Sequence, residues 1–467
     1  MVVTEKVPPQ TDMRRWRLRV KEGRQTWHYL ADEEQAKWPQ SIVDKYWLGL
    51  LQDEDVVSFE PAKTAREAAH HGWAFFSQLQ TEDGHWAGEY GGPLFLIPGL
   101  VIVCHVTGTP LPDECRLELI RYLKNTTTAE GGWGLHIEGQ AIVLCSALNY
   151  VTLRLLGVSP TDPVCVSARN FIRDQGGATG IPSWGKFWLA VLNVYDWEGV
   201  HPLLPELWLL PYWVPFHPGR MWCHCRQIYL PMSYCYAHRL RAEETELIRQ
   251  LREELYLIPY EDVRWIAARD DVAAVDCYAS HHPLLNVANM AMGVFERFHS
   301  SWLRQWALKE VVDHIRADDR NTKCISIGPI SKVINMLVMW HHDGPNSPAF
   351  MEHIERVPDY LWLAEDGMRM QGTNGSQLWD TALAVFGALE AGLDQYPEFQ
   401  TSFTEAYKFM DDCQIKENTQ DYEKYYRQVN KGAFPFSTRD CGWIVSDCTA
   451  EGLKATLYLH QLPFITR

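Results

Sequence analysis

The segment GWIVSDCTAEGLKA (442–455) places a carboxyl, Asp447, beside a thiol, Cys448, where a helix is expected to begin. A carboxyl can act as a general acid if it stays protonated near neutral pH, which requires burial away from water. The neighbouring S–H group could donate a weak hydrogen bond that orients the carboxyl without adding a competing base. Taken alone, however, Asp447 is better explained as the N-cap of the helix CTAEGLKATLYLHQ.

A second group of reactive side chains is WCHCR (222–226), in which Cys223 and Cys225 flank His224. The two cysteines alternate too closely around the histidine for a usual structural zinc pair, and no second Cys/His pair follows at a suitable spacing. We therefore expect no metal here. On its own, His224 is best explained as a hydrogen-bonded core histidine.

Helices must position these side chains, because the apolar spacing is helical along nearly the whole chain. The clearest segments are 112–125, 138–157 and 375–392, separated by clusters of Gly, Pro, Asn and Asp. Alternating strand patterns are scarce. The sequence therefore predicts an all-α architecture.

Composition and charge argue against several classes of protein, namely nucleic-acid-binding, secreted and membrane-spanning proteins. The chain has 467 residues and a formal charge of −16, which gives no support to nucleic-acid binding. Its N-terminus carries charges where a secretory signal needs an apolar core, so we expect an intracellular protein whose 12 cysteines are reduced. The apolar run 93–104 is shorter than the roughly 20 residues that span a bilayer, and predicts a core helix.

Two aromatic and proline-rich segments, 203–216 and 227–238, leave a choice open. Buried packing is favoured for both. Monotopic attachment to a membrane surface is the alternative.

A weak internal repeat links aromatic, amide and glycine positions. Its first unit contains Gln80, Gly84 and Trp86, and the corresponding amides of the next two units are Asn125 and Gln175. The period is about two helices with their turns, which fits stacked helix pairs, an α/α barrel, or a plain solenoid that binds proteins. We expect each amide to satisfy a helix end while the tryptophan packs over the turn.

These repeats, together with MWCHCR (221–226), TKCISIGPISK (322–332), MQGTNGSQLWDTA (370–382) and SDCTAE (446–451), resemble the oxidosqualene cyclase family. The resemblance covers nearly the whole chain, from about residue 25 to about residue 460, and implies a fold of two α/α barrels. It places a complete barrel at 90–362, whereas 1–89 and 363–467 would supply the N-terminal segment and the opening helices of the active-site barrel. Because family members continue beyond SDCTAE, we expect this chain to be truncated at its C-terminus.

The resemblance implies cyclisation of (S)-2,3-oxidosqualene, with Asp447 as the acid that opens the epoxide and Cys448 as its hydrogen-bond partner. No D-x-D-D cluster, which squalene-protonating relatives use, occurs in the chain. Aromatic faces stabilise a moving cation without trapping it. By position in the matched motifs, the expected cavity wall comprises Tyr90, Trp184, Trp222, Trp379 and Phe436.

Four further positions carry family roles. His224 is expected near the rearranged cation, where it helps to position or accept the final proton and favours a tetracyclic sterol product. Val445, where cycloartenol-forming members have isoleucine, favours lanosterol. Cys225 and Tyr229 match the constriction of the substrate channel.

The resemblance also implies a membrane-borne lipid substrate, monotopic attachment to the endoplasmic reticulum membrane or to lipid droplets, and no cofactor or metal. An incomplete barrel would expose an apolar face, so a protein partner or chaperone is expected to cover it. Two alternatives stay open. One is a catalytically inactive shortened isoform acting as a helical-repeat interaction protein, and the other is a zinc-dependent prenyltransferase on a similar barrel.

Overall fold

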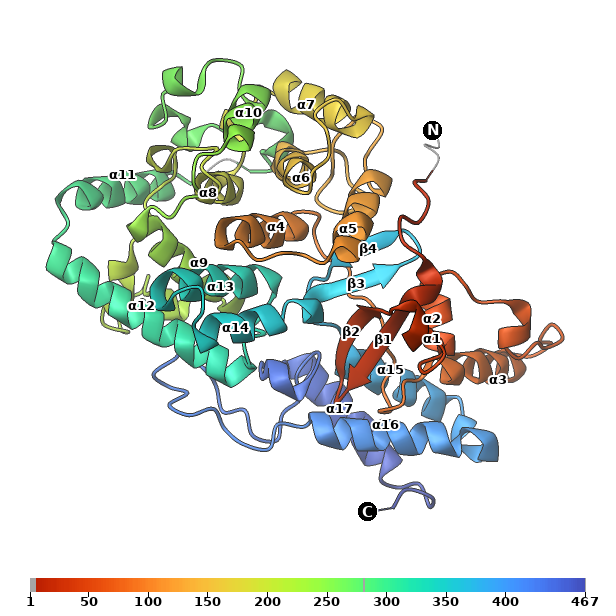
Figure 1. The fold of residues 1–467 in the computed structure, drawn as a ribbon. Helices are drawn as coiled ribbons and strands as arrows, with labels where there is room; N and C mark the ends of the chain where they lie inside the picture. Colours follow the sequence, from red (N-terminus) through yellow and green to blue (C-terminus); the bar gives the residue numbers. More distant parts are fainter. Residues whose placement is uncertain (1–5, 280–281, 467) are drawn as a thin grey trace. The chain divides into compact units, whose positions relative to one another are not determined.

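The computed structural model describes residues 6–279 and 282–466, and helices make up most of that length (Figure 1). The predicted all-α class is confirmed. The chain divides into two compact units. We call the first unit residues 6–8, Gly92–Asp318 and Ile330–Ile354, and the second unit Pro9–Gly91, Asp319–Pro329 and the chain from Glu355 onward. The complete and partial barrels, with the bounds that the resemblance implies, stay a prediction.

Most helices of the chain belong to the first unit. Their bounds are α4 (Leu96–Thr107), α5 (Asp113–Asn125), α6 (Val143–Leu155), α7 (Pro163–Asp174), α8 (Ser183–Val191), α9 (Cys223–His238), α10 (Glu246–Leu255), α11 (Pro283–Phe298), α12 (Ser301–Thr322), α13 (Pro329–Asp343) and α14 (Pro348–Glu355).

Helix α6 forms the centre of the first unit, because it contacts α4, α5, α7, α8 and α10 and is buried along almost its whole length. One of its buried polar side chains reaches the chain before α4: the Asn149 amide nitrogen donates to the Leu94 carbonyl oxygen at 2.9 Å. Helix α4 beside it is buried from Leu96 to Cys104, so the apolar run is a core helix, as predicted.

The second unit contains two antiparallel hairpins and six helices among its described residues (Figure 1). The strands are β1 (Trp16–Lys21), β2 (Arg24–Tyr29), β3 (Leu361–Ala364) and β4 (Gly367–Met370), and the helices are α1 (Asp32–Gln35), α2 (Ile42–Trp47), α3 (Ala65–Phe76), α15 (Gln377–Glu390), α16 (Gln400–Cys413) and α17 (Ser446–Leu459).

Helices α15, α16 and α17 pack against one another in the second unit. Their shared core contains Leu378 and Val385 from α15, Phe403 from α16, and Cys448 and Leu459 from α17. The alternation of these apolar residues with exposed polar ones is the pattern of helices that bury a single face.

The hairpin β1–β2 was not predicted. Its turn residues Glu22 and Gly23 have φ angles of 49° and 80°, which is the pattern of a two-residue type I′ turn. The sequence signal was the dipeptide Glu-Gly between WRLRVK, which alternates strictly between apolar and charged residues, and RQTWHY, where buried Gln25 interrupts the alternation.

The repeat tryptophans tie helix ends as expected in the first two repeats. Trp86 stacks on Phe76 with ring centroids 5.2 Å apart, and its indole N–H donates to the Phe76 carbonyl oxygen at 2.8 Å. Trp133 donates in the same way to the Leu123 carbonyl oxygen, also at 2.8 Å. The third repeat differs, because Trp184 donates to the Tyr229 hydroxyl at 3.3 Å.

The repeat amides behave less uniformly than the tryptophans. Gln80 donates to the carbonyl oxygens of Gly84 at 2.8 Å and Ser402 at 3.0 Å. Asn125 instead accepts a hydrogen bond from the Val7 backbone N–H at 2.7 Å. The Asn125 amide also lies with its Nδ2 3.3 Å from the Val7 carbonyl oxygen, so it holds the N-terminal segment.

Candidate functional site

Helix α17 presents the predicted acid. The helix begins at Ser446, and Val445 is its N-cap with extended backbone angles. Asp447 therefore lies inside the first turn, and its interpretation as the N-cap is wrong. A carboxylate at this position still interacts favourably with the helix dipole.

The burial predicted for Asp447 is absent from the described structure. Asp447 is exposed, and the Ser446 hydroxyl donates to its Oδ1 at 3.4 Å. The expectation that protein atoms of this chain desolvate the carboxyl is therefore wrong for the residues described, because the side of α17 that carries Ser446 and Asp447 faces solvent.

Cys448 lies next to it but points into the core. Its side chain is 1% exposed and belongs to the hydrophobic cluster of α15, α16 and α17. Burial raises the pKa of the Cys448 thiol to about 12, and the neighbouring Asp447 carboxylate adds to the rise. The sulfur therefore stays an S–H group at neutral pH, as a neutral hydrogen-bond donor requires.

Three predicted cavity aromatics form a cluster within the second unit. The ring of Phe436 lies 5.0 Å from Tyr90 at 74° and 6.1 Å from Trp379 at 26°. Phe436, Trp379 and Val445 also pack against the same hydrophobic cluster that contains Cys448. The structure thus brings five of the predicted site residues together in this unit.

Backbone hydrogen bonds hold these separate motifs in place. The Gly372 N–H donates to the Tyr90 carbonyl oxygen at 2.9 Å, and the Trp379 N–H donates to the Phe436 carbonyl oxygen at 3.2 Å. The Val445 N–H donates to the carbonyl oxygen of Phe434 at 3.2 Å. The position of the aromatic cluster is therefore fixed by main-chain groups, independently of side-chain rotamers.

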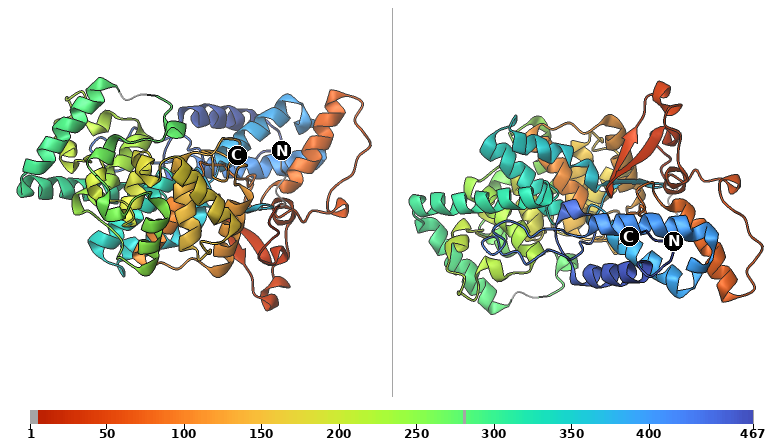
Figure 2. Two further views of the ribbon diagram at one scale, coloured as in Figure 1. Left: turned by 90° about the horizontal axis from the view of Figure 1, so that it is seen from above. Right: turned by 90° about the horizontal axis from the view of Figure 1, so that it is seen from below.

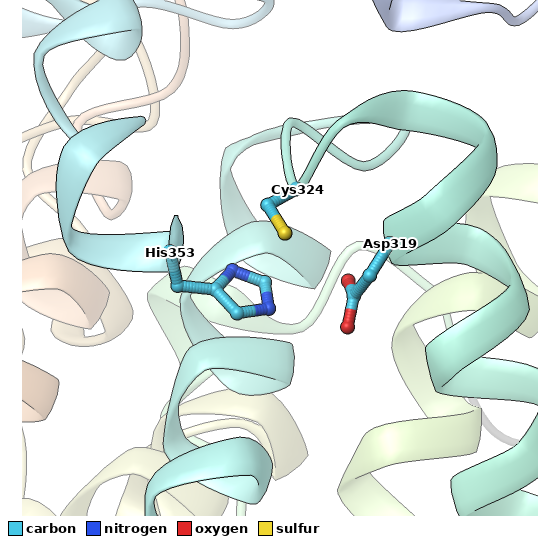
Figure 3. Close-up of side chains that lie close together, drawn as sticks. All are labelled: Asp319, Cys324 and His353. Atoms are coloured by element: carbon cyan, nitrogen blue, oxygen red, sulfur yellow. The ribbon is translucent and has the colours of Figure 1, made fainter. Parts of the chain in front are cut away.

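The turn after α12 supports the segment that leads into α17. Asp319 in the last turn of α12 and Cys324 just after the helix are buried (Figure 3), and the Cys324 N–H donates to the Asp319 carbonyl oxygen at 2.9 Å. The Cys441 thiol lies 3.8 Å from the Ser326 carbonyl oxygen. A Cβ at Gly442, which has φ of +65°, would lie 2.5 Å from the Asn321 carbonyl oxygen, so only glycine fits there.

His353, the third residue drawn in Figure 3, belongs to the first unit. There the Lys332 ammonium donates to the His353 carbonyl oxygen at 2.6 Å and lies 2.9 Å from its Nδ1. These bonds satisfy the buried Lys332 within its own unit.

Asp380 is a residue that the sequence analysis missed. It follows Trp379 on α15, and the Ser376 hydroxyl donates to its Oδ2 at 2.5 Å. Burial raises the pKa of Asp380, against the opposing effect of that hydrogen bond. Its signal was its place in the quoted motif QLWDTA, where a carboxyl directly follows a predicted cavity aromatic.

In the first unit, Trp184 and Tyr229 line one apolar cavity of about 350 Å³. The Trp184 ring also contacts Phe95 edge to face at 6.0 Å. The cavity wall also includes Leu204, Trp208, Met232 and, from α11, Leu285 and Met292. A predicted cavity aromatic and a predicted channel residue thus share one pocket.

The start of α9 carries Trp222, His224 and Cys225. Trp222 is 67% exposed, and its ring lies 4.6 Å from that of half-buried His224. Burial lowers the pKa of His224, so its imidazole is neutral near pH 7 and can accept a proton. Cys225 is half-buried and does not line the cavity of Trp184 and Tyr229.

An exposed apolar face occupies the same unit. Helix α11 has no buried residue, and Figure 2 shows it with the beginning of α12 at an edge of the first unit. Exposed side chains on these helices are Leu284, Val287, Met290, Val294, Phe298, Trp302 and Trp306, and the loop before α9 adds Tyr212, Trp213 and Phe216. We call these residues the apolar face.

The burial of individual side chains distinguishes the two segments for which membrane attachment was the alternative to buried packing. The segment 227–238 lies in α9, where Leu230, Met232 and Tyr234 are buried, so it is core and not surface. Segment 203–216 is divided, since Trp208 is buried and Trp213 is exposed. Among the residues that the structure describes, no helix combines the length and hydropathy required to cross a bilayer.

Comparison with known proteins decides the family. Residues 70–366 match the model of the squalene-hopene cyclase N-terminal domain. The chain belongs to the squalene-hopene cyclase family. Since that match covers more than half of the chain and contains most of α3 to α14, the helices of the first unit described above are those of the family domain.

Individual relatives match almost the whole chain. Lanosterol synthases of Mus musculus and Homo sapiens are 54% and 55% identical over 462 residues, which is 99% of this chain. Cycloartenol synthase of Dictyostelium discoideum is 49% identical over 96% of the chain. The chain spans 63% of the length of the two lanosterol synthases and 64% of the third relative.

Proposed function

We propose that this protein takes part in sterol synthesis by cyclising (S)-2,3-oxidosqualene to lanosterol, as an intramolecular transferase. The observation that carries the proposal is the 54–55% identity to two lanosterol synthases over 99% of the chain, which includes SDCTAE and MWCHCR. Val445 favours lanosterol over cycloartenol. The reaction is an isomerisation, so it requires an acid, a shaped cavity and a base.

The proposed acid is Asp447. Because its carboxyl is exposed, the desolvation that keeps it protonated would come from the apolar substrate that covers it. The proton is transferred to the epoxide oxygen, the C–O bond breaks, and the cation that forms is attacked by the neighbouring alkene. Cys448, a neutral thiol, supplies no competing base.

The aromatic cluster and His224 carry the later steps. Each desolvated face of Tyr90, Trp379 or Phe436 offers about 0.5–2 kcal/mol of cation–π attraction without a lone pair that could trap the cation. His224 is proposed to assist the final proton loss, since a lowered pKa leaves its imidazole neutral and able to accept a proton. Trp184 and Trp222 are proposed to add further aromatic surface.

We also propose monotopic attachment through the apolar face, on the endoplasmic reticulum membrane or on lipid droplets. Apolar side chains that project from α11 into the lipid would bind it in proportion to their area. The cavity of Trp184 and Tyr229 is lined by Leu285 and Met292 of that helix, which suits it to admit a long apolar substrate.

A product assay tests the reaction. The chain is incubated in detergent with oxidosqualene, and products are separated by gas chromatography. Lanosterol should form with the unmodified chain and with Asp412→Asn, an exposed carboxyl on α16, but not with Asp447→Asn. No product from folded, soluble chain would contradict the proposal and favour the helical-repeat interaction protein.

Membrane attachment has its own assay. Flotation with phosphatidylcholine vesicles should retain the unmodified chain and lose most of the variant Met290→Ser/Phe298→Ser. Ile137→Ser, a change at another exposed apolar residue of the first unit, should float normally. Equal flotation of all three would contradict attachment through α11.

A further inference from the structure

The hairpin β1–β2 concentrates positive charge on one face. Side chains alternate between faces along a strand, so Arg17, Arg19 and Lys21 share a face. The register places Lys21 directly opposite Arg24 and Arg17 directly opposite His28. Lys21 and Arg24 are therefore like charges directly opposite one another, an arrangement that is destabilising across a sheet. This arrangement is unexpected in a chain with a formal charge of −16. It indicates that the positive charge on this face has a functional role.

Two of these cations already have structural tasks. Arg17 is buried and donates to the carbonyl oxygens of Trp38, Arg14 and Trp16 at 2.6–2.8 Å. Arg24 donates to Asp359 at 2.9 Å and to the Glu355 carbonyl oxygen at 2.8 Å. The guanidinium groups of Arg17 and Arg24 are therefore held by hydrogen bonds within the second unit.

The other two cations have no such task. Arg19 and Lys21 are exposed, and neither has a carboxylate within ion-pair distance among the residues that the structure describes. Opposite Arg19, the Thr26 hydroxyl lies 2.8 Å from His28 Nε2. Two uncompensated cations thus share one face of the hairpin with a hydroxyl and an imidazole.

These side chains line a hollow of about 400 Å³. Its lining residues are Arg19, Lys21, Arg24, Thr26, His28, Glu355 and Pro358. Glu355 is the single acid among them, and its carboxylate lies 3.6 Å from Arg24 Nη1. Burial lowers the pKa of His28, and the charges of Arg19 and Arg24 lower it further, which is what a positive field in the hollow does.

We propose that this hollow binds a phosphate-bearing anion of the size of inorganic diphosphate. Arg19 and Lys21 provide the free charge, and the planar guanidinium of Arg19 can hold two phosphate oxygens at once. The Thr26 hydroxyl provides a further hydrogen bond. The site uses residues of the second unit alone and requires no part of the cyclisation chemistry.

Calorimetric titration with sodium pyrophosphate at low ionic strength tests the site. The variant Arg19→Gln/Lys21→Gln should bind at least tenfold more weakly than the unmodified chain. The matched control Lys37→Gln/Lys63→Gln removes the same charge from exposed positions of the same unit and should change the affinity less than twofold. Circular dichroism verifies that each variant is folded.

An NMR titration of histidine-labelled protein gives a local readout, with His28→Gln to assign the signal. Bound diphosphate should raise the pKa of His28, because an anion stabilises the imidazolium, and should not do so in the Arg19/Lys21 variant. Vesicles that contain phosphatidic acid, compared with free pyrophosphate, distinguish a lipid headgroup from a soluble anion, and binding of either supports the site.

Three results would overturn the proposal. The first is the absence of heat and of any His28 change at millimolar pyrophosphate. The second is an equal loss of affinity in the control variant, which would mean general electrostatic attraction. The third is binding of an acidic peptide alone, which would assign the hairpin face to a protein partner.

Discussion

The indole N–H of Trp133 donates a hydrogen bond to the Leu123 carbonyl oxygen, 2.8 Å away near the end of α5. Trp86 makes the same bond to the last residue of α3, Phe76. Carbonyl groups in the last turn of a helix have no intrahelical donor, so each tryptophan satisfies one of them and fixes the loop that carries it. In these two repeats the tryptophan therefore links the end of a helix to the loop that follows about ten residues later.

Replacing Trp133 by phenylalanine should lower the free energy of unfolding by about 0.5–1.5 kcal/mol, since the Leu123 carbonyl oxygen loses its shorter hydrogen bond and keeps the one from the Thr126 hydroxyl at 3.3 Å. Thermal or denaturant unfolding measures the change. Trp213→Phe is the control, because Trp213 is 76% exposed and should change stability by less than about 0.5 kcal/mol. Equal effects of the two changes would refute the role of the bond.

Gly84 should not tolerate a side chain. Its φ is +94°, and a Cβ would lie 2.2 Å from the Glu405 carbonyl oxygen, which cannot rotate away. Gly108 has φ of +69° with nothing within 4 Å, so Gly108→Ala should cost only about 1–2 kcal/mol. Gly84→Ala should cost clearly more in the same unfolding experiment, and a smaller cost than Gly108→Ala would show that the Gly84 turn can relax.

The Cys448 thiol should react slowly. Its pKa is raised from 9.0 to about 12, and the thiolate is the nucleophile, so iodoacetamide at pH 8 should label Cys448 at least tenfold more slowly than exposed Cys277. Mass spectrometry of timed digests gives both rates. Similar rates at the two sites would contradict the burial of Cys448.

The same shift has a consequence for stability. Above pH 9 the unfolded chain releases the Cys448 proton while the folded chain retains it, so unfolding releases a proton. The contribution is complete below pH 9 and is lost as the pH rises toward 12. Cys448→Ala, which removes this titration, should make stability less dependent on pH in that range.

Changing His224 to alanine should alter the products rather than the consumption of oxidosqualene. Epoxide opening depends on Asp447, whereas His224 is proposed to guide proton loss after rearrangement. Gas chromatography should show several products and at least a fivefold smaller lanosterol fraction. His238→Ala, an exposed histidine at the end of the same helix, is the control, and a single unchanged product from His224→Ala would remove the proposed role.

Several features could be predicted from the sequence because they depend on local patterns. Apolar spacing predicted the all-α class and the core helix α4, and the repeat predicted how Trp86 and Trp133 close their turns. The hairpin β1–β2 escaped prediction although WRLRVK alternates strictly, because in the second strand, RQTWHY, buried Gln25 interrupts the alternation that identifies a strand. The Gln25 Oε1 lies 3.1 Å from Nε2 of His85, a partner distant in sequence that no local pattern reveals.

Residue types and motifs by themselves determined the family. They also predicted that one active site contains Asp447, Cys448, Tyr90, Trp379 and Phe436. Only the tertiary structure decided their surroundings. It buried Cys448 while leaving its neighbour Asp447 exposed, and it raised the pKa of the Asp380 carboxyl by burial. The physical reason is that desolvation depends on what packs around a side chain, and residues distant in sequence supply that packing.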